Sequence, residues 1–299
     1  GGKQGVCNAI MALVNPGDEV IIPAPYWVSY PQMVKLAGGN PVIISAGIEQ
    51  DFKITAAQLE ASITPKTKMI ILCSPSNPTG SVYTKAELDE LAKVVISHED
   101  VFVLSDEIYE HINYIGKHAS IAACPNMKER TIICNGVSKA YAMTGWRLGW
   151  VAAPEWIVKG LNKLQGQYTS GTSSVSQMAA LAAYEGNQQC VEDFRKTFQR
   201  RRDLIVNLAK GIPGLEVNIP QGAFYLFPKC SSFFGKSNGK YTINNSTDLA
   251  MYLLEEGHVA TVGGDDFGSP DCFRMSYATS DDNIKEALQR IKDALSKLK

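Results

Sequence analysis

The sequence predicts an α/β fold, with a mostly parallel central sheet sandwiched by helices and a smaller α+β domain at the C-terminal end. Short apolar runs alternate with helical patterns over the first half of the chain, which is the order of elements in such a layered sheet. After Gly211-Ile-Pro-Gly214 this order changes, and strand patterns are flanked by helices. We therefore expect a large domain over residues 1–205 and a small domain over residues 206–299.

The expected strands are short apolar runs of buried-strand length, bounded by polar or turn residues. In the large domain they are residues 20–22, 42–44, 69–73, 101–105 and 131–135. In the small domain they are residues 215–219, 223–227 and 273–277. Residues 231–245 are rich in Ser, Gly, Asn and Lys, so we expect an exposed loop there.

The expected helices are marked by their ends and by their apolar spacing. Thr55 and Thr84 each stand three residues before a Gln or Glu, which is the capping-box pattern that opens a helix. These boxes predict helices that end near residues 63 and 97, and Pro154 opens a further helix. Helical patterns also cover residues 6–14, 190–210, 246–256 and 282–299, and the second of these is long, charged and amphipathic.

The composition argues against some classes of function. The chain has 299 residues, of which 45% are hydrophobic and 20% charged, as is typical of a soluble globular enzyme with a substantial core. The net charge of -1 argues against nucleic-acid binding through a basic surface. No apolar run approaches the length of a membrane span, so we expect no membrane partner.

The seven cysteines are scattered along the chain, without a CxxC pair. An odd number without clustering favours reduced thiols over a disulfide framework or a zinc site, and we expect a cytoplasmic protein. The four histidines (His98, His111, His118 and His258) show no metal-ligand spacing, so we expect no metal. The chain opens directly on Gly1-Gly-Lys-Gln-Gly5, as if within a domain, and we expect any targeting segment to lie upstream of it.

Lys139 is the residue that points most directly to chemistry. It follows the apolar run 131–134, and a lysine at the end of a buried strand loses hydration, which lowers its pKa toward the nucleophilic amine. Such an amine can form a Schiff base with an aldehyde. Arg147 follows eight residues later, and its planar fork suits a phosphate. An aldehyde that carries a phosphate is pyridoxal 5'-phosphate, and the alternative is that both residues are surface charges.

Polar residues follow two of the expected strands, at the strand ends where α/β sheets bind ligands. After the third strand, Asn77 offers an amide that can hydrogen-bond a phenolic oxygen; the alternative is a simple Pro/Gly turn. After the fourth, Asp106 can pair with a protonated pyridine nitrogen, and Tyr109 can reach the phenolic oxygen. The alternative there is a helix N-cap aspartate and a packing tyrosine. Glu107 and Glu110 are expected to be structural or exposed.

Further candidates lie near both ends of the chain. The glycines before the first expected helix, around Gly2 and Lys3, present backbone N–H groups to an anion. Trp27 can stack flat on an aromatic cofactor ring, although it also suits the core. Arg274 lies inside an apolar strand, where a buried guanidinium requires an anionic partner. A substrate carboxylate fits its fork, and the alternative is a structural ion pair with an Asp or Glu.

Set in order, these motifs resemble the class I aminotransferases of the aspartate aminotransferase fold, which is the PLP-dependent transferase fold type I. The resemblance runs nearly from end to end, through Pro16-Gly-Asp-Glu-Val, Pro25-Tyr-Trp, Ser76-Asn-Pro-Thr-Gly, Ser105-Asp-Glu-Ile-Tyr-Glu, Ser138-Lys-Ala-Tyr-Ala-Met-Thr-Gly-Trp-Arg and Arg274-Met-Ser-Tyr-Ala-Thr-Ser. It is strongest to the subgroup of bacterial and plant-type aspartate aminotransferases and aspartate-prephenate aminotransferases. It implies a transaminase acting on L-aspartate or L-glutamate and a 2-oxo acid such as 2-oxoglutarate, oxaloacetate or prephenate.

The resemblance also implies a role for each candidate residue. Lys139 is the Schiff-base lysine and the base that moves the proton between substrate Cα and cofactor C4'. Asp106 pairs with the pyridine nitrogen, while Asn77 and Tyr109 hold the phenolic oxygen. Trp27 stacks on the ring, and the phosphate is held by Arg147, Ser138 and the N–H groups of Gly2 and Lys3. Arg274 binds the substrate α-carboxylate, and Lys3 binds a distal carboxylate. Trp27 and Asn77 also lie beside the substrate.

This chain departs from the family pattern in two places. Family members often have a serine three residues before the lysine, where this chain has Gly136, and we expect Ser138 to compensate. Family chains also carry an N-terminal segment that supplies part of the small domain, a substrate-binding glycine and a phosphate-binding tyrosine donated across the dimer, and we expect this segment to be missing here. The resemblance implies a homodimer whose active site is completed by the partner chain.

Other functions remain open from the sequence. Another fold type I enzyme, such as an aromatic or kynurenine aminotransferase or a carbon–sulfur lyase, would use the same cofactor positions. A candidate of a different class is the ligand-sensing domain of a transcription regulator, which follows a DNA-binding head. The aminotransferase is favoured because every chemical position is filled.

Overall fold

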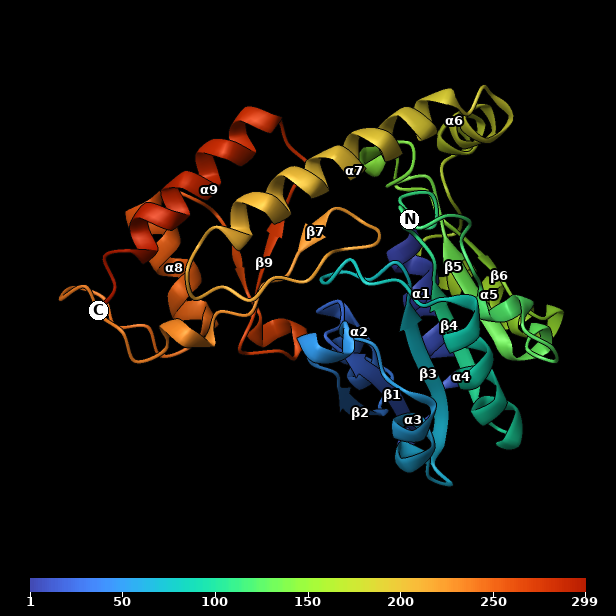
Figure 1. The fold of residues 1–299 in the computed structure, drawn as a ribbon. Coiled ribbons are helices and arrows are strands. Elements are labelled where there is room, and N and C mark those ends of the chain that lie inside the picture. The colour runs from blue at the N-terminus through green and yellow to red at the C-terminus, as the bar shows by residue number, and fades with distance from the viewer.

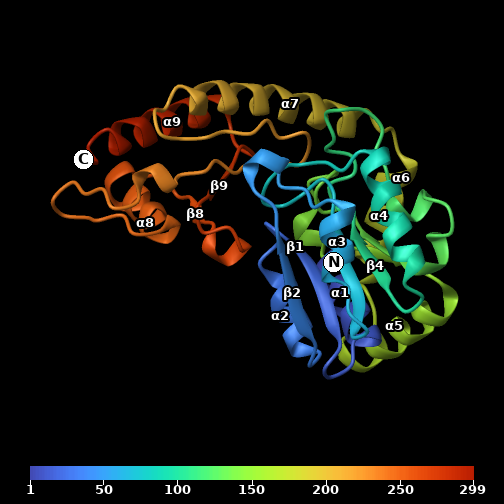
Figure 2. The same cartoon turned by 60° about the horizontal axis from the view of Figure 1, so that its bottom comes forward.

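The chain builds two sheets that are linked by one long helix, α7 (Gln189–Lys210), as Figure 1 shows. The computed structural model describes residues 1–299. The larger sheet has six strands in the order β2-β1-β3-β4-β5-β6, and the smaller has three in the order β7-β9-β8. Helix α9 (Asp281–Leu295) lies alongside α7 in both views (Figures 1 and 2). Helix α7 therefore attaches the small domain to the large one.

The larger sheet is parallel except at one edge. Its strands are β1 (Glu19–Ala24), β2 (Asn40–Ser45), β3 (Thr67–Cys73), β4 (Phe102–Asp106), β5 (Thr131–Asn135) and β6 (Trp150–Ala152). Strand β6 runs antiparallel to β5, and all other pairs are parallel. Every strand expected for the large domain is confirmed, and β6 is an addition. The parallel order brings the carboxyl ends of β1, β3, β4 and β5 to one edge of the sheet.

Helices cover both faces of the larger sheet. One face packs against α1 (Gly2–Leu13), α2 (Ser29–Leu36) and α5 (Glu155–Tyr168). The other packs against α3 (Ala56–Ser62) and α4 (Lys85–Ser97), and both of these begin with the predicted capping box. Successive residues of β3 alternate between the two cores, with Met69 and Ile71 in the first and Ile70 and Leu72 in the second. Burial on both faces is why these strands are continuous apolar runs in the sequence.

The smaller sheet has its own hydrophobic core. Strands β7 (Tyr225–Leu226), β8 (Val262–Gly263) and β9 (Phe273–Ser276) pack with α8 (Ser246–Gly257), α9 and the C-terminal part of α7. The residues of this core run from Ile205 to Leu298. They agree with an α+β small domain, while the boundary at residue 205 stays a prediction because α7 continues through it.

The strands expected at 215–219 and 223–227 are wrong in extent. Residues 215–219 form no strand, and only Glu216 makes a bridge, to Lys229. The second run shortens to β7. The reason lies between them, where the N–H groups of Gln221 and Gly222 both donate to the carbonyl of Gly80 in the large domain. The backbone hydrogen bonds of this segment therefore hold it to a turn of the other domain.

Other expectations need correction in the small domain and in two helices. Residues 231–245 are not an exposed loop throughout, because Phe233 and Ile243 are buried in the small-domain core. Helix α9 ends at Leu295, short of the expected residue 299. Helices α2 and α6 (Ser174–Glu185) were not expected from the sequence. Few residues of α6 are buried. The sequence therefore shows no buried apolar stripe by which this helix could be predicted.

Glycines permit a close approach between the start of α1 and the segment after β5. A Cβ on Gly149 would lie 2.3 Å from the Gly2 nitrogen, and a Cβ on Gly136 would lie 2.7 Å from the Gly149 Cα. Neither space admits a side chain without movement of the backbone. Gly136 is therefore required by packing in this chain, which explains why no serine stands there.

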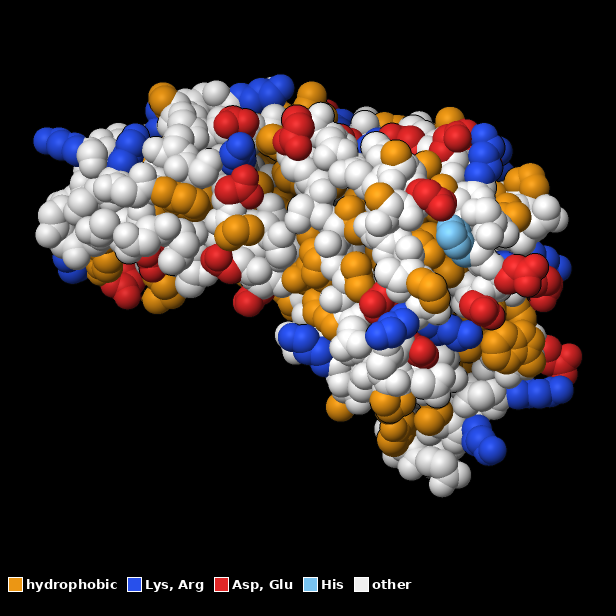
Figure 3. Space-filling view, turned by 90° about the horizontal axis from the view of Figure 1, so that it is seen from below, with side chains coloured by type: hydrophobic (Ala, Val, Ile, Leu, Met, Phe, Trp, Pro, Cys, Tyr) orange, Lys and Arg blue, Asp and Glu red, His pale blue; other side chains and the backbone are white.

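The structure has no helix that could span a membrane, and the face drawn in Figure 3 is not uniformly basic. None of the helices combines the length and the apolar character that a membrane crossing requires. Figure 3 shows one face, seen from below, on which Lys and Arg side chains are interspersed with Asp and Glu. This mixture accords with the net charge of -1.

Candidate functional site

All residues predicted for the site line a single cavity of about 440 Å³, a volume typical of small-molecule sites. They are Gly2, Lys3, Trp27, Asn77, Asp106, Tyr109, Ser138, Lys139, Arg147 and Arg274. The structure therefore brings together every predicted position, from both sheets, while the role of each residue stays a prediction. Further lining residues were missed by the sequence analysis, and they are Tyr30, Cys73, Ile108, Thr144 and Tyr225.

The order of the strands explains why the large-domain residues meet. Asp106 is the last residue of β4, and it lies in register between Cys73 of β3 and Cys134 of β5. Asn77 follows β3 and Lys139 follows β5, so turns on both sides of Asp106 supply polar groups. This edge is the carboxyl end of a parallel sheet, where α/β proteins bind ligands.

Asp106 is a buried carboxylate whose two oxygens each accept a hydrogen bond. The Tyr30 hydroxyl donates to Oδ2 at 2.6 Å, and the Ile108 N–H donates to Oδ1 at 3.3 Å. Burial raises the pKa of Asp106, and the hydrogen bond from Tyr30 opposes that shift. Asp106 precedes no helix, so the N-cap alternative is not what the structure shows. The carboxylate is held in one orientation, with lone pairs left for a ligand.

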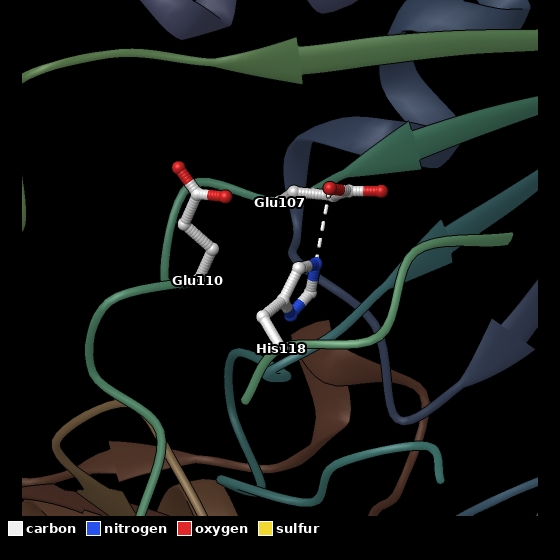
Figure 4. Close-up of side chains that lie close together, drawn as sticks. All are labelled: Glu107, Glu110 and His118. Carbon is white, nitrogen blue, oxygen red and sulfur yellow. Dashed lines mark hydrogen bonds and ion pairs between the residues drawn. The ribbon is translucent and has the colours of Figure 1, made fainter. Parts of the chain in front are cut away.

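The neighbouring Glu107 anchors the turn that carries Asp106 (Figure 4). Its buried carboxylate accepts hydrogen bonds from the hydroxyls of Ser105 at 2.9 Å and Ser120 at 2.6 Å. His118 Nε2 lies 3.0 Å from the other oxygen, as the dashed line in Figure 4 marks. Glu110 is not bonded to this pair, although one of its carboxylate oxygens lies within 4.8 Å of a Glu107 oxygen and of a His118 ring nitrogen. Glu107 is thus structural, as expected, and it ties the end of β4 to residues 118–120.

Lys139 lies partly buried beside two aromatic rings. Its Nζ is 5.8 Å from the ring centroids of Tyr109 and Phe224. Burial lowers the pKa of Lys139, and the positive charges of Arg147 and Arg274 lower it further. The shift has the direction that the sequence predicts, and it favours the neutral amine that acts as a nucleophile or a base.

Arg147 lies against the N-terminus of α1. A Cβ on Gly1 would be 2.7 Å from Nη2 of Arg147, so only glycine lets the guanidinium approach this closely. Nη1 of Arg147 donates to the Thr144 carbonyl at 2.7 Å. The first N–H groups of an α-helix have no partner within the helix, and together with the helix dipole they attract an anion. The guanidinium and the helix start therefore form one corner of the cavity, whose charge and N–H donors suit an anion.

Arg274 has no carboxylate partner in the protein. Its guanidinium lies between two rings, 4.7 Å from the centroid of Tyr225 and 4.9 Å from that of Phe267. Nη1 donates to Oδ1 of Asn77 at 2.8 Å, across the two sheets. The alternative of a structural ion pair is therefore not observed. The bond also occupies the Asn77 oxygen, which leaves the Asn77 amide nitrogen to donate to a ligand.

The cavity is rich in positive charge. Lys3, Lys139, Arg147 and Arg274 line it, against the single carboxylate of Asp106. Lys3 is exposed, and its Nζ lies 4.9 Å from the ring centroid of Trp27. Such an imbalance of charge requires anions to complete it.

The missed tyrosines gave weak signals in the sequence. Tyr30 follows Trp27 by three residues, and only the unexpected helix α2 turns it toward Asp106. Tyr225 lies in an apolar run in which Ala223, Leu226 and Phe227 are also buried, which is the pattern of core filler. The sequence therefore contains no signal that separates Tyr225 from the core.

These residues fit pyridoxal 5'-phosphate, the cofactor that the resemblance implies. The arginine and helix start at Arg147 suit a phosphate, the buried Asp106 suits a pyridinium, and Asn77 and Tyr109 offer donors for a phenolic oxygen. Lys139 supplies an amine for an aldehyde, with its pKa shifted in the required direction. No position of this donor set is filled by a residue of the wrong chemistry.

Comparison with known proteins gives consistent matches over the whole chain. Residues 1–291 match the family described as aminotransferase class I and II. A bifunctional aspartate aminotransferase and glutamate/aspartate-prephenate aminotransferase of Petunia hybrida is 48% identical, over 100% of this chain and 64% of its own length. An aspartate/prephenate aminotransferase of Cereibacter sphaeroides is 49% identical, over 97% of this chain and 74% of its own. The crystal structure of an aspartate aminotransferase from Rhizobium meliloti superposes with a TM-score of 0.96 at 46% identity, covering 100% of this chain and 76% of that one.

Proposed function

Because the chain belongs to the class I and II aminotransferases, which depend on pyridoxal 5'-phosphate, we propose that it exchanges an amino group between L-aspartate or L-glutamate and a 2-oxo acid. The names of the similar proteins support aspartate and glutamate as substrates and prephenate as an acceptor. We also propose oxaloacetate and 2-oxoglutarate as acceptors, as the resemblance implies. The chain spans 64% of the Petunia relative, so the activity of the whole protein is a proposal.

The observation that carries this proposal is the charge of the cavity. Four cationic side chains (Lys3, Lys139, Arg147 and Arg274) line it with one carboxylate, Asp106. Lys139 acts as a neutral amine in this proposal, which leaves three cations. A phosphate at Arg147, an α-carboxylate at Arg274 and a distal carboxylate at Lys3 would each neutralise one of them. A dicarboxylic amino acid therefore suits the cavity better than an uncharged one.

In this proposal the cofactor is held at the carboxyl end of the larger sheet, by residues that follow different strands and by the start of α1. Arg147, Ser138 and the first N–H groups of α1 at Gly2 and Lys3 hold the phosphate. Asp106 pairs with the pyridine nitrogen, and Trp27 packs on the ring. Asn77 and Tyr109 donate to the phenolic oxygen. When bound, the cofactor supplies the aldehyde that takes up the amino group and a ring that accepts electrons.

Lys139 is proposed to move the proton. Its pKa is lowered by burial and by two neighbouring guanidinium groups, so its Nζ is a base at neutral pH more readily than an exposed lysine. In the proposal this nitrogen takes the proton from the substrate Cα. Arg274 holds the α-carboxylate so that this Cα stays within reach, and its rigid fork fixes the orientation.

The test is an assay of aspartate with 2-oxoglutarate, oxaloacetate being measured as the product, followed by a comparison of oxaloacetate and prephenate as acceptors for glutamate. We expect turnover of aspartate, and Lys139→Ala should lower it by several orders of magnitude. The control is Lys159→Ala, because Lys159 is exposed on α5 and pairs only with Glu155. Turnover restricted to aromatic amino acids would contradict the proposed substrate, and normal turnover in Lys139→Ala would contradict the proposed mechanism.

We also propose that the chain forms a homodimer in which the partner chain completes the site. Helix α6 leaves Val175, Met178 and Leu181 on one side, with exposed fractions of 68%, 64% and 45%. A second cleft of about 390 Å³ shares Gly1 and Arg147 with the region of the site, so a chain seated in it would reach the phosphate corner. Met178→Glu should yield monomers in light-scattering measurements, whereas Met251→Glu on α8 should not.

The compartment is proposed to be a reducing one, such as the cytoplasm. All seven cysteines have free thiols in the structure, and four of them are buried. Buried free cysteines behave as small apolar residues, and a reducing compartment preserves them. Labelling of thiols in the protein as isolated from cells, without added reductant, tests this proposal.

A further inference from the structure

Tyr225 joins two residues of the proposed site that come from different domains. It lies on β7 of the small sheet, it is 7% exposed, and it lines the cavity. Its hydroxyl is 2.9 Å from the hydroxyl of Tyr109, which follows β4 of the large sheet. Its ring centroid is 4.7 Å from the guanidinium carbon of Arg274. One side chain thus contacts both the residue proposed for the phenolic oxygen and the residue proposed for the α-carboxylate.

The two hydroxyls share one hydrogen bond, so only one of them is the donor. The guanidinium of Arg274 lies next to Tyr225 and stabilises negative charge on its phenol. Burial raises the pKa of both phenols; the hydrogen bond with Tyr109 and then the charge of Arg274 oppose the shift of Tyr225, while the pKa of Tyr109 is raised well above its usual value. The more acidic phenol is the better donor. Either hydroxyl can be the donor of this bond, and the guanidinium next to Tyr225 favours donation by Tyr225, which would leave the proton of Tyr109 to point elsewhere.

The ring of Tyr225 acts on Arg274 from one side. A second ring, that of Phe267, also lies close to the guanidinium, with its centroid 4.9 Å from the guanidinium carbon. Asn77 takes one edge at 2.8 Å. The remaining edge is the part of the fork that is left for a carboxylate, and its orientation depends on the two rings.

We propose that Tyr225 is a positioning residue of the site: its hydroxyl donates to Tyr109, so that the Tyr109 proton points at the ligand, and its ring holds the plane of Arg274. This inference rests on the proposed function, because it takes Tyr109 and Arg274 as the contacts of cofactor and substrate. The two effects are separable, since phenylalanine keeps the ring and removes the hydroxyl, whereas leucine removes both.

The experiment compares the wild-type protein with Tyr225→Phe and Tyr225→Leu, each loaded with pyridoxal 5'-phosphate. The first readout is the pH midpoint of the change in visible absorption of the bound cofactor, measured without any amino acid. The second is KM and kcat for aspartate and for alanine, with 2-oxoglutarate as the acceptor. The control is Tyr114→Phe, because the Tyr114 hydroxyl donates to the Ala223 carbonyl in the same aromatic cluster but does not line the cavity.

In Tyr225→Phe we expect the absorption midpoint to rise by roughly 0.1 to 0.7 pH unit, because Tyr109 keeps its own hydrogen bond to the charged oxygen of the ligand and that bond weakens by about 10–30%. The midpoint rises because a weaker donor at Tyr109 stabilises the deprotonated form of the chromophore less. KM should change little in this variant. In Tyr225→Leu we expect KM for aspartate and alanine to rise alike, by roughly 2- to 30-fold, because one of the two rings beside Arg274 is lost. Tyr114→Phe should change neither readout.

An unchanged or lowered midpoint in Tyr225→Phe would overturn the proposed donation to Tyr109, and an unchanged KM in Tyr225→Leu would overturn the role of the ring. If Tyr225→Leu fails to fold, the midpoint of Tyr225→Phe decides the proposal. The midpoint requires no turnover. Failure of the proposed function would therefore appear differently, as a wild-type protein that does not turn over aspartate while Tyr225→Phe still shifts the midpoint.

Discussion

Replacing Tyr30 by phenylalanine should destabilise the protein in a way that depends on pH. The Tyr30 hydroxyl donates to the buried Asp106 carboxylate at 2.6 Å, and the other oxygen of Asp106 accepts only the longer bond of 3.3 Å from the Ile108 N–H. The Tyr30 ring is fully buried and packs edge-on against Trp27, and phenylalanine keeps this contact. The substitution therefore removes the shorter of the two hydrogen bonds and little else.

The magnitude follows from the charge on Asp106. A hydrogen bond to a charged group contributes about 1.5–3 kcal/mol, whereas a neutral one contributes about 0.5–1.5 kcal/mol. The charged bond exceeds the neutral one by about 0.5–2 kcal/mol, so at 1.36 kcal/mol per pKa unit its loss should raise the pKa of Asp106 by about 0.4–1.5 units beyond its already raised value. A folded-state pKa above the unfolded one means that stability is lost as pH rises through the folded pKa. The variant raises that pKa further, so its deficit is small in acid and grows as Asp106 ionises.

The assay is urea unfolding of the cofactor-free protein, from mildly acidic to mildly alkaline pH. The free energy of unfolding should fall by about 1 kcal/mol in acid and by about 1.5–3 kcal/mol at the alkaline end. The matched control is Tyr83→Phe, which removes a buried hydroxyl that accepts only the Ile54 N–H, and whose deficit should stay nearly constant. A constant deficit in Tyr30→Phe, or one that is larger in acid, would refute the idea that Asp106 is an ionised partner of Tyr30.

Further predictions concern the substrate cations and a glycine. Arg274→Lys should reduce kcat/KM for aspartate and alanine alike, by roughly 1.5–3 kcal/mol per lost charged hydrogen bond, and a loss confined to aspartate would contradict the α-carboxylate role. Lys3→Ala should reduce kcat/KM for aspartate and leave alanine unchanged, so equal effects on both would remove Lys3 from the distal carboxylate. Gly149→Ala should lower the free energy of unfolding by about 1–3 kcal/mol, because its Cβ would lie 2.3 Å from the Gly2 nitrogen. The control Gly166→Ala in α5, where a Cβ meets nothing within 4 Å, should stabilise the protein slightly in the same unfolding measurement.

The parts of the fold that the sequence predicts well are those in which local signals agree with tertiary burial. The run 131–135 became β5 without change, and Thr55 and Thr84 cap their helices as expected, because strand burial and side-chain caps are both written in adjacent residues. Residues 215–219 failed for the opposite reason. Their apolar pattern is that of a strand, but the neighbouring backbone bonds to Gly80, more than a hundred residues earlier, and no local signal reports this.

The candidate site follows the same rule. Lys139, Asp106 and Asn77 stand in polar motifs after strands, and the topology then requires that they meet. Tyr30 and Tyr225 lie in apolar surroundings, where a tyrosine is also ordinary core filler. Their hydroxyl contacts, with Asp106 and Tyr109, depend on the docking of α2 and of the small sheet, which sequence spacing does not give.

The hydrogen bond between Arg274 and Asn77 joins positions 197 residues apart, and the cavity also takes Lys3 from the first helix. Contacts between such distant segments are closed late, because the loss of chain entropy comes before the gain from the contact. We therefore expect the binding site to be among the last parts of the molecule to be assembled during folding. A ligand that binds only the finished cavity draws the folding equilibrium toward completion. The amount of cofactor bound in a protein preparation should therefore measure the number of chains in which the first helix and the last strand have both docked.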